Sequence, residues 1–212
     1  DRMSAFQVAR QMLALQQKSN ILDAVSYIMR HVNSDGLFFV APPDGAPRYA
    51  LRATYWKDST PPGKNDADYP IVFTLPHVQN MAGLKAGLQM LRLLHNELTP
   101  EERETARQVG TTIPRMREAL NEILWDSEYK TFIIGKDATT TIRGISSDAL
   151  YASAYMEPTD MPKGRMRTVA NTSRALATPI GYRGLAEADT RRARRAAEKA
   201  GAVFDDYHTD PV

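Results

Sequence analysis

Apolar residues recur every three or four positions over several stretches of the chain, which is the spacing of one face of an α-helix. Residues 4–17 and 20–32 show this pattern first, and turn-forming residues at 33–36 follow them. The longest pattern covers residues 74–95, and Thr74 is a candidate for its N-cap. We therefore expect two helices that form a hairpin, followed by a longer helix.

A further helix is predicted after residue 98. Thr99, Pro100 and Glu102 have the pattern of a capping box, in which two side chains satisfy backbone N–H groups at a helix start. The helical pattern continues to about Trp125 and contains Pro114. Proline lacks a backbone donor and its ring clashes with the preceding turn, so we expect a kink or a restart of the helix there.

The rest of the chain alternates between irregular and short helical stretches. Residues at about 34–73 form a long irregular insertion, and residues 130–146 are rich in β-prone side chains that predict a short hairpin or an extended excursion. Three more helices are expected at 146–156, 164–176 and 187–201. About seven helices joined by uneven loops predict an all-α fold of helical hairpins, which pack as a bundle, a solenoid or a closed toroid.

The composition is that of a folded and nearly neutral protein. The chain has 212 residues, and its 42% of hydrophobic residues can build a continuous core. The formal net charge is +2, and acidic residues lie near the arginine run at 191–195, so we expect a solvated helix there and no nucleic-acid partner. The chain has no Cys, and its four His are not spaced as metal ligands, so we expect neither disulfides nor structural zinc.

Targeting segments are not evident in the sequence. No apolar run approaches the roughly 18 residues of a membrane span, so we expect no membrane partner, and no secretory signal is predicted at the N-terminus. The lack of Cys fits a cytoplasmic location and leaves export open. The chain starts at Asp1 and ends in a partly apolar segment, so we expect a single domain over residues 1–212 that is cut from something longer at both ends.

The stretch YWKDS at 55–59 is a candidate pocket rim, because Trp56, Lys57 and Asp58 stand directly before a loop of Pro, Gly and Asp. Aromatic faces stack on the apolar faces of sugar rings, and carboxylates bind hydroxyl groups. A carboxyl group in a partly dry pocket can also be held protonated as a general acid. These residue types suit a carbohydrate site. The alternative is an exposed corner with Trp56 packed into the core.

Other polar residues are weaker candidates. His77 and Asn80 lie three positions apart on the long predicted helix, so both project from nearly the same face; the alternative is that they are satisfied polar residues near the helix cap. Asp148 is interpreted first as an N-cap or first-turn carboxylate and second as a ligand. Tyr207 and His208 stand among acidic residues, a composition that resembles the lip of a site.

Several stretches taken together resemble one family. In order along the chain they are YWKDS, YPIVFTLPHVQNMAGLKAG, ALNEILWDSEY, SSDALYASAYM, LATPIGYRGL and DDYHTDPV. Their order and spacing are similar to the amylo-α-1,6-glucosidase, or glycogen debranching, type of glycoside hydrolase. The resemblance covers the chain from about residue 20 to its end. It implies part of an (α/α)6 toroid, built of helical hairpins, with a pocket at the end where the long loops gather.

The resemblance also implies an inverting mechanism with two carboxyl groups roughly 6.5–9.5 Å apart, one protonating the glycosidic oxygen and the other activating water. Asp58 matches the position of the acid. The implied substrate-binding residues are Trp56 as a stacking wall, Lys57, His77 and Asn80 as hydroxyl ligands, and Tyr207 and His208 on the far side. The family's Trp-Pro and following carboxylate would come after Val212, so we expect the general base beyond it. No metal or organic cofactor is needed for this chemistry.

Two alternatives stay open. The first is a hydrolase of the same toroid that acts on rhamnosides, trehalose or glycosylated small solutes instead of α-linked glucose. The second is a non-catalytic helical-repeat module whose concave face binds protein or peptide. The second alternative predicts that Trp56 and Asp58 do not converge with Tyr207 and His208, whereas the toroid requires that they do. The sequence does not define the oligomeric state.

Overall fold

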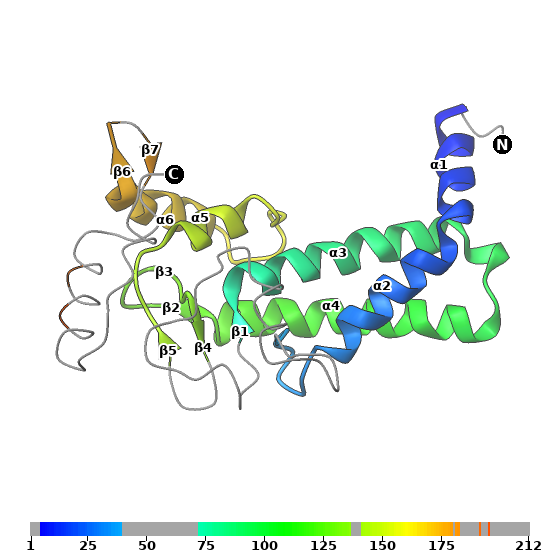
Figure 1. The fold of residues 1–212 in the computed structure, drawn as a ribbon, viewed down its shortest axis with the longest axis horizontal. Helices are drawn as coiled ribbons and strands as arrows, with labels where there is room; N and C mark the ends of the chain where they lie inside the picture. Colours follow the sequence, from blue (N-terminus) through cyan, green and yellow to red (C-terminus); the bar gives the residue numbers. More distant parts are fainter. Residues whose placement is uncertain are drawn as a thin grey trace.

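A computed structural model of the chain describes residues 5–39, 72–136, 141–179, 181–182, 191 and 195 (Figure 1). Within these ranges the protein is mainly helical and carries several two-residue strands. The prediction of a mainly helical protein is therefore confirmed. No helix among these residues is both long and apolar enough to cross a membrane. Residues 40–71, which make up most of the irregular insertion expected at about 34–73, lie outside the described residues, as does most of the helix expected at 187–201.

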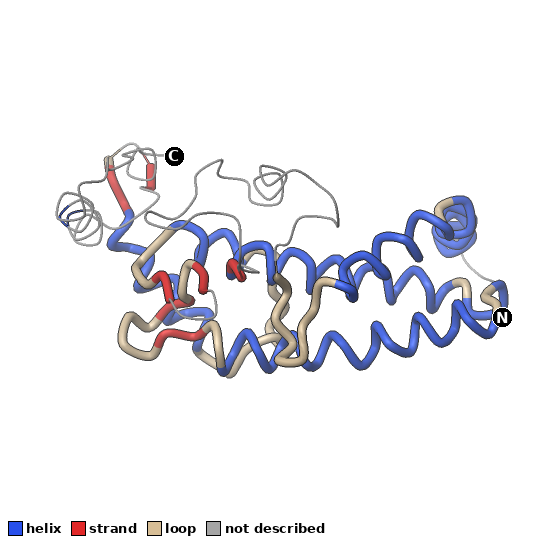
Figure 2. Tube along the Cα trace, turned by 60° about the horizontal axis from the view of Figure 1, so that its bottom comes forward, coloured by secondary structure: helices blue, strands red, loops and turns tan. Residues whose placement is uncertain are grey.

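Two long helices form the centre of the fold and run side by side along its longest direction, as Figure 1 and Figure 2 both show. They are α3 (Thr74–Leu93) and α4 (Pro100–Glu122), joined through the short 3-10 helix η2 (His95–Glu97). The predicted capping box starts α4. The Thr99 hydroxyl accepts the Glu102 N–H at 3.3 Å, and the Glu102 carboxylate accepts the Thr99 N–H at 2.8 Å.

Two predictions for these helices are corrected by the structure. Thr74 is the first residue of α3 rather than its cap, and its hydroxyl donates to the Ile133 carbonyl at 2.5 Å. It does so because strand β1 (Val72–Phe73) leads straight into the helix and holds Thr74 against the segment around Ile133. Pro114 lies inside α4, which continues to Glu122, so the restart does not occur, while the alternative expectation of a kink stays a prediction.

Two N-terminal helices flank this pair. Helix α2 (Lys18–Arg30) packs against both α3 and α4, and Lys18 lies 2.9 Å from the Glu102 carboxylate at the start of α4. The predicted turn at 33–36 follows α2. Helix α1 (Ala5–Gln16) lies at the end of the bundle where α2 begins (Figure 1). The two predicted helices are confirmed, but the predicted hairpin is wrong: only Gln17 separates them, and α1 contacts α3 instead of folding back along α2.

The apolar residues of α1 differ from the expectation of a buried stripe. Its Ala14 is fully buried. Four larger apolar side chains are 39–59% exposed: Val8, Met12, Leu13 and Leu15. The described part of the chain therefore leaves most of this face of α1 uncovered.

Short strands gather at the end of the bundle opposite α1 (Figure 1). They are β1, β2 (Trp125–Asp126), β3 (Thr131–Phe132), β4 (Gly135–Lys136), β5 (Thr141–Ile142), β6 (Ala177–Thr178) and β7 (Gly181–Tyr182). One sheet has the order β1-β4-β5, and two further pairs are β2-β3 and β6-β7. Gly135 pairs antiparallel with Ile142, so the hairpin predicted in this region is confirmed.

Three short helices follow the strand region, and one of them packs on α3. They are α5 (Ser147–Ser153), α6 (Arg165–Thr172) and the 3-10 helix η3 (Ser173–Leu176). Helix α5 contacts α3 directly, and α6 contacts α5. Helices predicted at 146–156 and 164–176 are thus confirmed within shorter bounds.

Much of the core lies between α2, α3 and α4, and it continues into the strand region and into α5 and α6. Its fully or almost fully buried members on α2–α4 include Val25, Val78, Met81, Leu84, Leu91, Met116 and Leu120. They recur at helical spacing on facing helices, so the sequence pattern and the packing agree. This core holds the start of α3 in place, where the predicted site residues His77 and Asn80 lie.

Candidate functional site

Most of the residues assigned to a site from the sequence lie outside the described residues: Trp56, Lys57, Asp58, Tyr207 and His208. Their roles stay predictions, as does the expected convergence of the two segments that carry them. His77 and Asn80 are described, and both lie in the first half of α3.

His77 is fully buried and has partners on two other segments. Its Nδ1 accepts the Phe38 N–H at 3.1 Å, and its Nε2 lies 3.0 Å from the Met116 carbonyl. The two contacts together place the proton on Nε2, which donates to that carbonyl. Burial lowers the pKa of His77 to about 4, against the opposing effect of the Met116 hydrogen bond, so the ring is neutral at pH 7.

This geometry favours the structural alternative for His77, because both ring nitrogens already bind protein atoms. Asn80 is half-buried, and its amide donates to the Pro76 carbonyl at 2.8 Å. The hydroxyl-ligand roles of His77 and Asn80 stay predictions. The neighbouring Gln79, which is not among the candidates from the sequence, borders an open pocket.

This pocket lies between the first half of α3 and the end of α5, and it has a volume of about 360 Å³. Its described lining consists of Leu75, Gln79, Tyr151, Ala154 and Tyr155. Leu75 and Gln79 are one helical turn apart on α3. Tyr151 and Tyr155 are one turn apart at the end of α5, because the Tyr155 N–H donates to the Ala152 carbonyl at 3.0 Å and continues the turn.

The lining combines an apolar floor with aromatic walls. Leu75 is 3% exposed and forms part of the floor, whereas Tyr151 and Tyr155 are 37% and 47% exposed. None of the described lining residues carries a charge. Such a pocket suits an uncharged ligand with an apolar face and a few polar groups.

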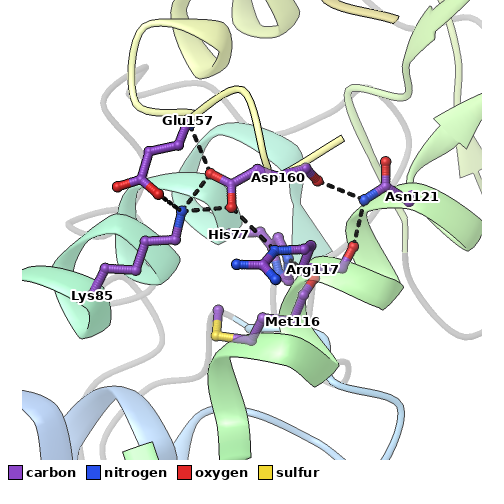
Figure 3. Close-up of polar contacts among 7 residues, drawn as sticks. All are labelled: His77, Lys85, Met116, Arg117, Asn121, Glu157 and Asp160. Carbon is purple, nitrogen blue, oxygen red and sulfur yellow. Dashed lines mark hydrogen bonds and ion pairs between the residues drawn. The ribbon is translucent and has the colours of Figure 1, made fainter. Parts of the chain in front are cut away.

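A buried charged cluster holds the chain that follows Tyr155. Asp160, between α5 and α6, is 0% exposed. Its carboxylate lies 2.5 Å from the Lys85 Nζ of α3 and 3.2 Å from the Arg117 Nε of α4, and it accepts the Glu157 N–H at 2.8 Å (Figure 3). A buried carboxylate is costly unless it is paired and hydrogen-bonded. Asp160 meets that condition and fastens the segment between α5 and α6 to both long helices.

Asn121 and Arg165 extend this cluster. The Asn121 side-chain amide donates to the Asp160 carbonyl at 2.7 Å, and Arg165 Nη1 donates to Asn121 Oδ1 at 2.9 Å. The Arg165 guanidinium also lies 4.3 Å from the centre of the Trp125 ring, within the range of a cation–π contact. The segment is therefore held at both ends, at Glu157 and at the start of α6.

Asp126, in the LWD stretch of the resemblance, is a buried carboxylate with a structural role. Arg143 Nε lies 2.6 Å from its Oδ2, and the Glu128 and Tyr129 N–H groups donate to its Oδ1. Burial raises the pKa of Asp126, but these hydrogen bonds outweigh burial and hold it below its ordinary value. A carboxylate kept ionised in this way is unsuited to donate a proton, so Asp126 is not a candidate general acid.

Asp148 lies in the first turn of α5, as its first interpretation predicted, and it is also buried, with 1% exposed. Its second interpretation, as a ligand, stays a prediction. Ser146 occupies the N-cap position without a side-chain hydrogen bond to the helix.

The sequence interpretation missed the pocket residues and the charged cluster. Two tyrosines four positions apart, outside the apolar stripe of a predicted helix, are a signal that could have indicated Tyr151 and Tyr155. Lys85 and Asp160 are 75 residues apart, and no local pattern connects them.

No group of three or more His, Cys, Asp or Glu that could hold a metal ion is found among the described residues. No protein-family model, curated protein or solved structure matches the chain. The resemblance to glycoside hydrolases therefore stays a prediction.

Proposed function

We propose that the protein is a glycoside hydrolase of the helical-toroid class that cleaves α-glucosidic bonds, with α-1,6 linkages as the first to test. The observation that carries the proposal is the uncharged, tyrosine-lined pocket between α3 and α5. Aromatic rings stack on sugar faces, and an amide binds hydroxyl groups through both its donor and its acceptor. These are the interactions that a site for neutral sugars needs.

The order of the elements adds support. The YWKDS stretch precedes β1 in the sequence, and β1 leads directly into α3, the helix that forms one wall of the pocket. Packed helical pairs with short non-helical segments at one end are also compatible with part of a toroid of hairpins (Figure 1). In the proposed mechanism Asp58 protonates the glycosidic oxygen while a carboxylate on the opposite side activates water.

The proposal is tested by sugar titration and by variants of the 55–70 segment. Calorimetry with maltose, isomaltose, trehalose, rhamnose and glucose measures binding, and glucose release from a branched dextrin measures hydrolysis. We expect an α-glucoside to bind. Asp58→Asn should keep that binding and lower hydrolysis by at least about 100-fold, because a general acid contributes that much or more.

Asp66→Asn is the matched control, since it makes the same change in the same segment but outside the YWKDS stretch. It should leave both binding and hydrolysis unchanged. An equal loss in the two variants, or the absence of binding and hydrolysis for every sugar, would contradict the proposal. Preference for trehalose or rhamnose would instead identify a different glycoside substrate for the same class of enzyme.

A helical-repeat interaction module is the second candidate, and one observation favours it. The exposed apolar side chains of α1 have the character of a protein-binding surface: Val8, Met12, Leu13 and Leu15. If no sugar binds, this reading becomes the better one.

A further inference from the structure

We infer that the pocket between α3 and α5 binds one pyranose ring of an α-glucoside, which stacks on Tyr155 and forms hydrogen bonds with Gln79. The choice of a glucoside rests on the proposed function. The choice of an uncharged sugar ring as the ligand class rests on the pocket itself.

The two walls present complementary groups across the pocket. Leu75 and Gln79 come from α3, and Tyr151 and Tyr155 come from the end of α5, which packs on α3. Tyr155 is 47% exposed, so part of its ring is open to a ligand. A sugar ring has an apolar face of C–H groups and an edge of hydroxyls, which matches an aromatic wall opposite an amide.

Gln79 and Tyr155 also have unused hydrogen-bonding capacity. Neither side chain forms a hydrogen bond within the described part of the chain. The Gln79 amide is only half-buried, so it can exchange water for the hydroxyls of a ligand. One amide offers both a donor and an acceptor, which is the pair that a sugar hydroxyl requires.

The charges nearby disfavour anionic ligands. The described lining contains no Lys, Arg or His. Lys85, further along α3, is 12% exposed and is bound to Asp160 and Glu157. A phosphate or carboxylate ligand would therefore find no free cation among these residues, whereas a neutral ligand needs none.

The Tyr155 wall is fixed before a ligand arrives. Met156 is 9% exposed, and Asp160 fastens the segment that follows to α3 and α4. A wall that is already ordered loses little entropy on binding. The volume of about 360 Å³ lies at the small end of the range for small-molecule sites, which favours a single ring over a long chain.

The test measures binding of methyl α-glucoside to the full chain by calorimetry and by saturation-transfer NMR. Tyr155→Ala should raise the Kd at least about 10-fold, and Tyr155→Phe should raise it less than about 3-fold because the stacking ring remains. Gln79→Ala should raise the Kd about 5-fold or more.

Tyr27→Ala is the matched control, since Tyr27 is a 38% exposed tyrosine on α2, and it should leave the Kd unchanged. Circular dichroism checks that each variant is folded.

The outcomes separate this inference from the proposed function. Sugar binding that is unaffected by Tyr155→Ala and Gln79→Ala overturns the inference, even if Asp58-dependent hydrolysis is found. Sugar binding that depends on Tyr155 without any hydrolysis supports the inference and contradicts the proposed activity. Binding of phenol but not of methyl α-glucoside, or no binding at all, also overturns the inference.

Discussion

His77 shows how a single polar side chain can be part of the core. It is fully buried on α3, and its two nitrogens join the segment after α2, through Phe38, to α4, through Met116. Burial lowers its pKa from 6.5 to about 4. The unfolded chain therefore takes up a proton at a higher pH than the native protein does.

This difference predicts a pH dependence of stability. The contribution of His77 is complete above pH 6.5 and is lost as the pH falls toward about 4. The full loss is about 3 kcal/mol, since each pKa unit corresponds to roughly 1.4 kcal/mol. Urea unfolding near pH 7 and near pH 4.5 measures most of this loss. His77→Gln should be less stable than the wild type at the higher pH but should lose less on acidification. An equal loss in both proteins would show that His77 does not titrate in this way.

Element positions follow from the sequence to a large extent, and the failure at Thr74 has a cause far along the chain. Periodicity predicted α2, α3 and α4, and the capping box at Thr99 fixed the start of α4 correctly. The prediction of Thr74 as a cap is wrong because β1 leads into α3 without a break. The Thr74 hydroxyl donates to the Ile133 carbonyl instead. A strand pairing of this kind depends on residues far along the chain, which local patterns do not contain.

The contact between α2 and α3 gives a prediction for one glycine. A Cβ added at Gly87 would overlap Val25 Cγ1, whereas one added at Gly83 would lie 3.4 Å from Ile28 Cδ1. Val25 is buried and β-branched, so it cannot rotate away easily. Gly87→Ala should therefore lower the free energy of unfolding by about 1–3 kcal/mol, despite the better helix propensity of Ala.

Gly83→Ala is the matched control, because it makes the same change one turn earlier on the same helix. It should leave stability unchanged or raise it by up to about 1 kcal/mol. Urea unfolding of both variants provides the comparison. If Gly87→Ala is as stable as Gly83→Ala, α2 and α3 do not pack as closely as the structure indicates.

At the scale of the whole molecule, the sequence predicted the type of the elements better than the site between them. Gln79 and Tyr155 are separated along the chain by most of α3, all of α4 and the strand region. Their proximity depends on how α5 packs on α3 and on the cluster around Asp160. Neither feature has a sequence signal, because each is a pairing between distant residues.

Asp160 connects two parts of the molecule, the α5–α6 segment and the α2–α4 core (Figure 3). Ala149 and Ala152 of α5 and Val169 of α6 pack into the same hydrophobic cluster as α2–α4, but α5 and α6 are short helices of 7 and 8 residues. Short helices depend on tertiary contacts for their stability. We therefore expect the α5–α6 segment to open at a lower free energy than the core.

Asp160→Asn removes the charge that pairs with Lys85 and Arg117, and breaking a buried pair costs about 3 kcal/mol or more. Hydrogen exchange should then speed up by about 100-fold in α5 and α6, since 1.4 kcal/mol corresponds to a factor of ten, while α2–α4 stay protected.

Glu157→Gln is the matched control, because this other partner of Lys85 is 56% exposed and its ion pair contributes little. A uniform loss of protection across all helices would contradict this expectation, since it would mean that the segment and the core unfold as one unit. Faster exchange confined to α5 and α6 would mean that the pocket wall at Tyr155 depends on Asp160, so sugar affinity should fall in the same variant.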